Sequence, residues 1–205
     1  MAGTNAFVPN GLTVSGARSR AGGAATYQNN LCTIKAGYGS NIGRGDLVNR
    51  GTGGNAGYAV LSLLTDTGTW GVFTTVYPYY DLTAQQTMHG LIGAYQSTAN
   101  PSADIQASLV DDPFVTFIAQ VSGGPWVQSW AGQNINFLAG TNGAPNVSGQ
   151  STLALDASTI ATTNTLPFQM LGVVGTVGGP QDPTFTNPWI EVRLNTAALL
   201  NSTGR

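Results

Sequence analysis

Charged side chains are scarce in this sequence. Asp, Glu, Lys and Arg together make up 8 % of its 205 residues, whereas about 25 % is usual for a soluble domain. The single cysteine, Cys32, excludes an intrachain disulfide and a metal site built from several cysteines. No stretch approaches the roughly 18 apolar residues of a membrane-spanning helix, and the N-terminus has neither the basic head nor the apolar run of a secretory signal. We therefore expect a soluble chain that is intracellular when made and has no membrane partner.

Residues that favour helices are also rare. The sequence has one lysine and one glutamate but 28 glycines, and it is rich in Thr and Asn, which favour strands and turns. Helical patterns are confined to a single turn at 81–86 and a short tail at 196–200 that Asn195 would cap. The composition predicts an all-β protein with little helix.

Hydrophobic periodicity indicates where the strands lie. Apolar residues alternate with polar ones at 104–109 and 189–194, which predicts strands that bury one face. Four stretches are more continuously apolar, as is typical of strands covered on both faces: 58–64, 69–77, 114–121 and 168–177. Breaks rich in glycine and proline separate the apolar segments every roughly ten to twenty residues, as in a barrel or sandwich.

We divide the chain into an extended N-terminal arm, residues 1–30, and a single β domain, residues 31–205. The arm is rich in Gly, Ala and Asn and shows little periodicity. The domain is expected to be a β-barrel or a β-sandwich, jelly-roll-like in its strand pattern. Residues 97–104 predict an internal connector, so the pattern is compatible with one barrel or with two small β subdomains.

The few charges are separated along the chain. Residues 1–50 carry five of the seven Lys and Arg residues against one acid, Asp46, whereas residues 51–190 carry seven aspartates and no Lys or Arg. Such an asymmetry can mark a basic arm that meets an acidic partner or nucleic acid; five charges spread over fifty residues are also compatible with ordinary solvated side chains. The candidate contact residues for such a partner are Arg18, Arg20, Lys35 and Arg44.

Catalytic patterns are not evident. The only histidine, His89, lies next to Gly90 in a turn-like segment, where a surface or packing role is expected; a hydrolase triad would need it near both a nucleophile and an orienting acid. The G-x-S-x-G elbow does not occur. Asp111 and Asp112 are adjacent, so on a strand they would point to opposite faces and could not converge. The G-x-G-x-x-A match at 51–56 precedes a strand-like segment rather than the helix that a dinucleotide site requires. We expect no enzymatic activity, no cofactor and no metal.

Aromatic residues offer a binding alternative. Trp126 and Trp130 would share one face of a strand and could stack on a sugar. Nucleic-acid binding would need Lys or Arg among the aromatics to neutralise phosphates, and residues 51–190 have neither. A carbohydrate-binding β module therefore stays open as an alternative, and nucleic acid is not an expected partner.

Several motifs, in order and spacing, resemble those of a family of small tailed-bacteriophage proteins, the capsid decoration or cement proteins. The resemblance covers roughly residues 40–195, and its motifs are Gly-Asp-Leu-Val at 45–48, Thr-Trp-Gly-Val-Phe at 69–73, Tyr-Pro-Tyr-Tyr-Asp at 77–81, Leu-Val-Asp-Asp-Pro-Phe at 109–114, Leu-Ala-Leu-Asp at 153–156, Phe-Gln-Met-Leu-Gly-Val-Val at 168–174 and Ile-Glu-Val-Arg-Leu-Asn at 190–195. The chain departs from the family at 93–96, where Gly-Ala-Tyr-Gln replaces the Trp-Pro that usually follows the tyrosine-rich turn.

The resemblance implies a virion structural protein, made in the cytoplasm of the bacterial host, that sits on the outside of an icosahedral head and clamps neighbouring subunits of the major capsid protein. It also implies that the chain associates with itself, with a homotrimer favoured over a dimer. The basic segment would then face the capsid, whose outer surface is commonly acidic. Another virion component, such as a head fibre or a tail-spike domain, is the alternative within the same class.

Overall fold

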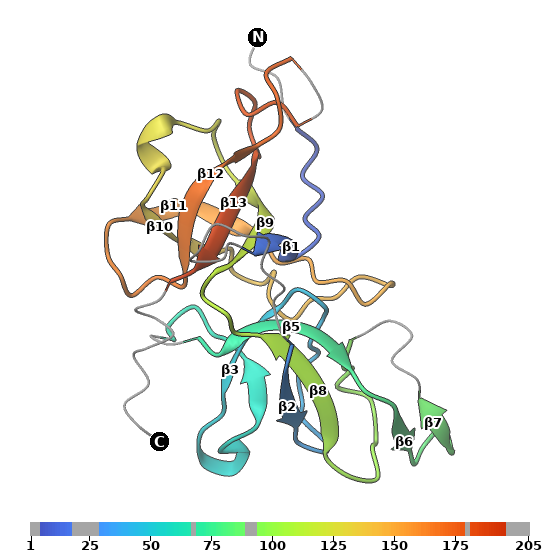
Figure 1. Ribbon diagram of the computed structural model, residues 1–205. Coiled ribbons are helices and arrows are strands. Elements are labelled where there is room, and N and C mark those ends of the chain that lie inside the picture. Colours follow the sequence, from blue (N-terminus) through green and yellow to red (C-terminus); the bar gives the residue numbers. More distant parts are fainter. Residues whose placement is uncertain (1–4, 18–28, 67–68, 89–93, 179–180, 196–205) are drawn as a thin grey trace.

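The computed structural model describes residues 5–17, 29–66, 69–88, 94–178 and 181–195. Within these ranges the regular structure consists of strands and of two short 3-10 turns, Gly53–Asn55 and Gln128–Trp130. The expected all-β class with little helix is confirmed. No helix in the described part of the chain is long and apolar enough to cross a membrane. The strands form two units that lie one above the other in Figure 1.

The first unit is a small, partly open barrel with one added strand. Its strands are β1 (Thr13–Ala17), β9 (Val115–Ser122), β10 (Asn134–Phe137), β11 (Leu155–Ala161), β12 (Phe168–Val174) and β13 (Trp189–Leu194). The pairings run β9-β11-β10-β12-β13 and return from β13 to β9, which closes the ring. The parallel β9–β11 pairing and the antiparallel β10–β12 pairing each span only two residue pairs, so the barrel is least firmly closed on either side of the β11–β10 hairpin. β1 pairs antiparallel with β9.

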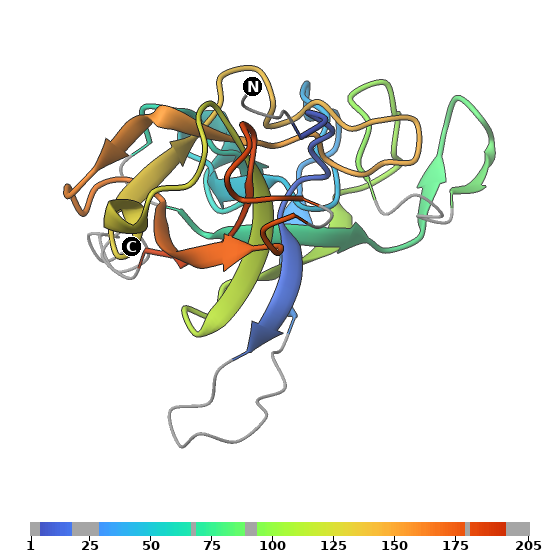
Figure 2. The same cartoon turned by 90° about the horizontal axis from the view of Figure 1, so that it is seen from above.

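The second unit is a curled antiparallel sheet. Its order is β2-β8-β5-β3-β4, with bounds β2 (Asn30–Ile34), β8 (Ile105–Val110), β5 (Gly71–Val76), β3 (Leu47–Arg50) and β4 (Ala59–Leu61). The outermost strands, β2 and β4, approach each other, so the sheet is a partial barrel. A separate hairpin of β6 (Tyr79–Asp81) and β7 (Gln86–Met88) extends from the second unit and projects to the right in Figures 1 and 2.

Successive residues of the second unit's strands enter two different cores. In β3 and β5, Val48 and Phe73 lie inside the second unit, whereas the neighbouring Leu47 and Val72 belong to the core of the barrel. Neighbours on a strand point to opposite faces, so this sheet is covered on both sides where it meets the barrel. That double burial explains why residues 69–77 are almost continuously apolar.

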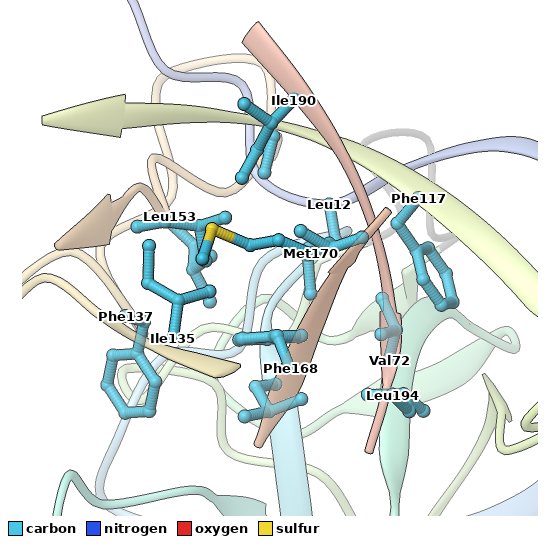
Figure 3. Close-up of a cluster of buried hydrophobic side chains, with 14 of the residues drawn as sticks. Leu12, Val72, Phe117, Ile135, Phe137, Leu153, Phe168, Met170, Ile190 and Leu194 are labelled. Carbon is cyan, nitrogen blue, oxygen red and sulfur yellow. The ribbon is translucent and has the colours of Figure 1, made fainter. Parts of the chain in front are cut away.

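The barrel core is filled from alternate positions of its strands. Ile190, Val192 and Leu194 of β13 are buried there, as their alternation predicts, while the residues between them are half-buried. Figure 3 shows Leu12 of the N-terminal segment and Val72 of the second unit packed among the barrel side chains. Each fully buried side chain of this size contributes roughly 1.5–3 kcal/mol.

In the order of the chain, the second unit is inserted between β1 and the other strands of the barrel, although β1 pairs directly with β9 in space. Residues 5–17, part of the predicted arm, lie along the chain's own barrel, where the Gln120 side chain accepts a hydrogen bond from Val8 N–H (2.8 Å) and donates one to the Ala6 carbonyl (2.7 Å). The remaining arm residues, except 29 and 30, lie outside the described residues. The predicted connector 97–104 lies within the second unit, just before β8, and the chain crosses to the barrel at 111–114.

Two local expectations are corrected. Residues 81–86 are not a helical turn: they join β6 to β7, and the Asp81 carboxylate accepts hydrogen bonds from the N–H groups of Thr83 and Ala84 (2.8 and 2.9 Å). An aspartate that bonds the backbone two and three residues ahead stabilises a tight turn. Trp126 and Trp130 are not on a strand, because Gln128–Trp130 is a 3-10 turn. The predicted tail helix at 196–200 lies outside the described residues.

Candidate interaction surface

Lys35 follows β2 and lies beside an acid of its own chain. Its ammonium donates a hydrogen bond to the Gly54 carbonyl at 2.7 Å. The Asp104 carboxylate accepts hydrogen bonds from Ala36 N–H (2.9 Å) and from the Tyr58 hydroxyl (2.8 Å). These two bonds, and the nearby Lys35 charge, lower the pKa of Asp104. The positive charge of Lys35 is therefore partly offset within the chain.

Arg44 lies where the two units and the N-terminal segment meet. We call residues 43–46 and 149–151 the junction. The exposed guanidinium of Arg44 donates two hydrogen bonds to Gln150 Oε1, at 3.1 and 2.8 Å. Its backbone pairs with the barrel-side loop, through Arg44 N–H to the Gly149 carbonyl and Ser151 N–H to the Arg44 carbonyl, both at 2.9 Å. Arg44 is thus held on a fixed backbone with its charge facing solvent.

The four basic candidates are not brought into one cluster by any contact of the described residues. Lys35 bonds the loop before β4, and Arg44 bonds the loop before β11. Arg18 and Arg20 lie outside the described residues. A joint role of the four in partner binding stays a prediction.

The junction encloses a buried acid, Asp46. Its carboxylate accepts hydrogen bonds from the Ser151 hydroxyl, from Gly43 N–H at 2.6 Å and from Gly143 N–H. The side chain is fully buried, and no ion pair with it is found in the part of the chain that the structure describes. Burial raises the pKa of Asp46 to about 6, although the bonds from Ser151, Gly43 and Gly143 oppose the rise. Asp46 therefore ties residues from both units together at an electrostatic cost.

A glycine lets the N-terminal segment reach the junction. Leu12 N–H donates a hydrogen bond to the Gly45 carbonyl at 3.0 Å. Gly45 has a φ of +94°, and a Cβ at this position would lie 2.9 Å from the Leu12 nitrogen. A larger residue would therefore suffer both backbone strain and a clash.

The hairpin β6–β7 and the residue that leads into it carry large uncharged side chains that are exposed. Tyr77, Tyr80 and Leu82 are exposed by 41, 45 and 50 %; we call these three side chains the hairpin surface. An isolated two-stranded hairpin is marginal in water, and this one is held by Asp81, whose second oxygen accepts a bond from Asn100 N–H at 2.9 Å. Backbone bonds from Ala84 and Asn100 lower the pKa of Asp81. The hairpin surface is thus presented on a base that is fixed to the second unit.

Trp126 and Trp130, the candidate sugar-stacking pair, do not lie side by side on one face. The rings of Trp126 and Trp130 meet edge to face, with centroids 5.8 Å apart and planes at 82°. Both are half-buried and pack against the barrel core. An edge-to-face pair does not offer two coplanar faces to one sugar ring, so the arrangement is typical of packing.

The aspartates considered as catalytic candidates each have a structural partner within the chain. Asp111 accepts a hydrogen bond from the Asn30 carboxamide at 2.5 Å, and Asp112 accepts one from Phe114 N–H at 2.8 Å. Both stabilise the crossing between the units. His89 lies outside the described residues. Over the described ranges, no group of three His, Cys, Asp or Glu side chains is placed to hold a metal ion.

Comparisons with known proteins give no family assignment: no family model matches the chain, and neither a curated protein nor a solved structure is significantly similar to it.

Sequence reasoning missed two features of this surface. The sequence pattern predicts a helical turn at 81–86 and no hairpin, although Tyr79–Asp81 and Gln86–Met88 flank a four-residue turn, a spacing common in hairpins. The burial of Asp46 was not anticipated, because it depends on Gly143 and Ser151, about a hundred residues further along the chain. The local signal was only an aspartate next to the buried strand β3.

Proposed function

We propose that the protein is a capsid decoration (cement) protein that binds the outside of an icosahedral phage head and bridges subunits of the major capsid protein. The observation that carries the proposal is the hairpin surface: two tyrosines and a leucine, all exposed and uncharged, on or next to a projecting element of a chain with few charges. Soluble proteins usually keep such side chains for contacts with partners. A protein bound at many equivalent sites of a shell can use contacts that are individually modest.

The ordered motifs support the same proposal. Gly-Asp-Leu-Val at 45–48 forms part of the junction and of β3, Thr-Trp-Gly-Val-Phe at 69–73 leads into β5, and Asp-Asp-Pro-Phe at 111–114 is the crossing between the units. The tyrosine-rich turn at 77–81 leads into the hairpin. The motifs of the resemblance therefore build the junction, the crossing and the base of the proposed contact surface.

Removing the hairpin surface is expected to weaken capsid binding without unfolding the chain. The double variant Tyr80→Ser, Leu82→Ser replaces two exposed side chains, and exposed substitutions usually change stability by about 0.5 kcal/mol or less. We expect at least a tenfold loss of affinity, about 1.4 kcal/mol, in co-sedimentation with undecorated phage heads. Val147→Ser, at a fully exposed position outside the hairpin, is the matched control. Equal binding by the double variant and this control would contradict the proposal for the hairpin.

Replacing Arg18, Arg20, Lys35 and Arg44 together with Ser is expected to weaken binding to heads and to reduce its salt dependence, because exposed charge pairs are screened by salt. Binding is measured over a range of NaCl concentrations. Undiminished binding by the fourfold variant would rule out the basic contact residues.

Electron cryo-microscopy of heads mixed with the purified chain tests the function itself. Ordered density at fixed positions between capsid subunits would support decoration and would show whether the chain binds as a trimer or as a dimer. Bare heads at saturating protein would favour a fibre, tail-spike or glycan-binding role, and a glycan array would then be the next measurement.

A further inference from the structure

The sequence contains two Asn-Gly dipeptides, Asn10–Gly11 and Asn142–Gly143, and the structure treats them in opposite ways. Asn-Gly is the dipeptide most prone to deamidation, because glycine leaves its own backbone nitrogen open to attack the preceding carboxamide. The reaction requires that the Asn side chain move freely and that the glycine N–H be available. These two requirements can be compared directly at the two positions.

Asn142 meets neither requirement. Its carboxamide oxygen accepts a hydrogen bond from Leu47 N–H at 2.9 Å, and its NH₂ group donates to the carbonyls of Leu47 (3.0 Å) and Ser62 (2.9 Å). The attacking atom is also engaged, because Gly143 N–H donates to the buried Asp46 carboxylate. Three side-chain bonds at about 1 kcal/mol each would have to open before reaction, a protection of roughly a hundredfold.

Asn10 is freer in both respects. Its side chain is exposed, and within the described ranges neither its carboxamide nor Gly11 N–H has a hydrogen-bond partner, although Gly11 itself is buried against Ser151. The backbone on either side is nevertheless fixed: the Asn10 carbonyl accepts a bond from Gln150 Nε2 at 2.6 Å, and Leu12 N–H donates to the Gly45 carbonyl. The Asn10 carboxamide is therefore accessible and unbonded, whereas the buried Gly11 beside it is part of the backbone that joins the N-terminal segment to the junction.

We propose that Asn10–Gly11 is a site of spontaneous deamidation and that its product loosens the N-terminal segment from the junction. The Gly11 nitrogen loses its proton and attacks Cγ of Asn10, the bond from Cγ to Nδ2 breaks, and ammonia leaves. Water then opens the cyclic imide at one of its two carbonyls, which gives aspartate or isoaspartate at position 10. In the isoaspartate the main chain runs through Cβ and Cγ, which lengthens it by one carbon, and the former Asn10 carbonyl that Gln150 holds becomes a carboxylate outside the main chain. Leu12, which is buried in the barrel core, therefore cannot keep its place.

The test follows both dipeptides in the same molecule. The folded chain is incubated at pH 8 and 37 °C and digested, and deamidation at each position is measured by peptide mass spectrometry, with isoaspartate detected by enzymatic methylation. We expect Asn10 to react and Asn142 to stay intact, and we expect both to react at similar rates in denaturant, where the structural difference is gone. A folded chain in which Asn142 reacts as fast as Asn10 would overturn the proposal.

The Asn10→Ser variant isolates the structural consequence. It keeps the backbone bonds at this position but cannot form the imide. After the same incubation we expect a lowered melting temperature for the natural chain and an unchanged one for the variant. Equal melting temperatures, with isoaspartate present at position 10 in the natural chain, would refute the loosening of the junction.

Discussion

Replacing Asp46 with Ala is expected to destabilise the protein by about 3 kcal/mol, because three donors lose their acceptor in a buried place. The Ser151 hydroxyl and the N–H groups of Gly43 and Gly143 all point at the carboxylate. They come from both sides of the junction, so the loss weakens the contact between the units rather than one strand. Denaturant unfolding measures the change in the free energy of unfolding.

The same residue is expected to make stability depend on pH. The pKa of Asp46 is raised to about 6 in the folded chain, from an ordinary value of 3.8, so the folded state binds the proton more tightly than the unfolded state. The contribution of this group to stability is therefore greatest below pH 3.8, is lost as the pH rises toward 6, and changes little above that. The loss amounts to roughly 3 kcal/mol, at about 1.4 kcal/mol for each pKa unit.

Asp46→Asn is the matched control, because it keeps the shape of the side chain and carries no charge. We expect this variant to lose less stability than Asp46→Ala at pH 7.5 and to lack the fall in stability between pH 4 and pH 6. The measurement is the unfolding free energy at half-unit pH steps for the natural chain and both variants. An identical pH profile for the natural chain and Asp46→Asn would show that another group is responsible.

The second large effect concerns the coupling of the two cores. Phe117 fills the barrel and Phe73 fills the second unit, and both are fully buried. Replacing either with Ala should cost about 3–5 kcal/mol through lost burial and the cavity left behind. Because one face of the second sheet contributes Leu47, Val72 and Val110 to the barrel core, we expect each variant to lower the stability of both units together.

Tryptophan fluorescence can follow the units separately. Trp126 and Trp130 pack on the barrel core and Trp70 packs on the second core. One background keeps only Trp70, and the other carries Trp70→Phe and keeps the remaining tryptophans. We expect the two backgrounds to give the same denaturant midpoint, both with Phe73 and with Phe73→Ala. If Phe73→Ala shifted the midpoint only in the background that keeps Trp70, the two units would unfold independently.

Much of the fold followed from local patterns. Alternation identified β8 and β13, and continuous apolar runs identified β5 and β9, because burial leaves a trace in the order of side chains. β8 is covered on more than the one face that its alternation predicts, since Ser108 is buried together with Leu109 and Val110. β1 left no such trace. Its sequence, Thr-Val-Ser-Gly-Ala, is weakly apolar, and it becomes a strand through β9, as in the 2.8 Å contact of Ser15 with Thr116, 101 residues away.

The candidate interaction surface could not be predicted from the sequence to the same extent. The composition shows that charged side chains are scarce, but it cannot indicate which aromatic residues are exposed. Trp126 and Trp130 pack against each other and the barrel, whereas Tyr80 points outward on the hairpin. The difference between a packed and a presented aromatic depends on tertiary contacts, which a single sequence does not encode locally.

The insertion of the second unit between β1 and β9 also has a consequence for synthesis on the ribosome. Strands β2 to β8 are contiguous in the chain, so the second unit can pair its strands as soon as Val110 has left the exit tunnel. β1 emerges first yet must wait for β9, and the ring closes only when β13 arrives at its end. The earliest residues of the barrel therefore remain exposed longest in the nascent chain, and a chaperone that holds newly made protein would be expected to bind there first.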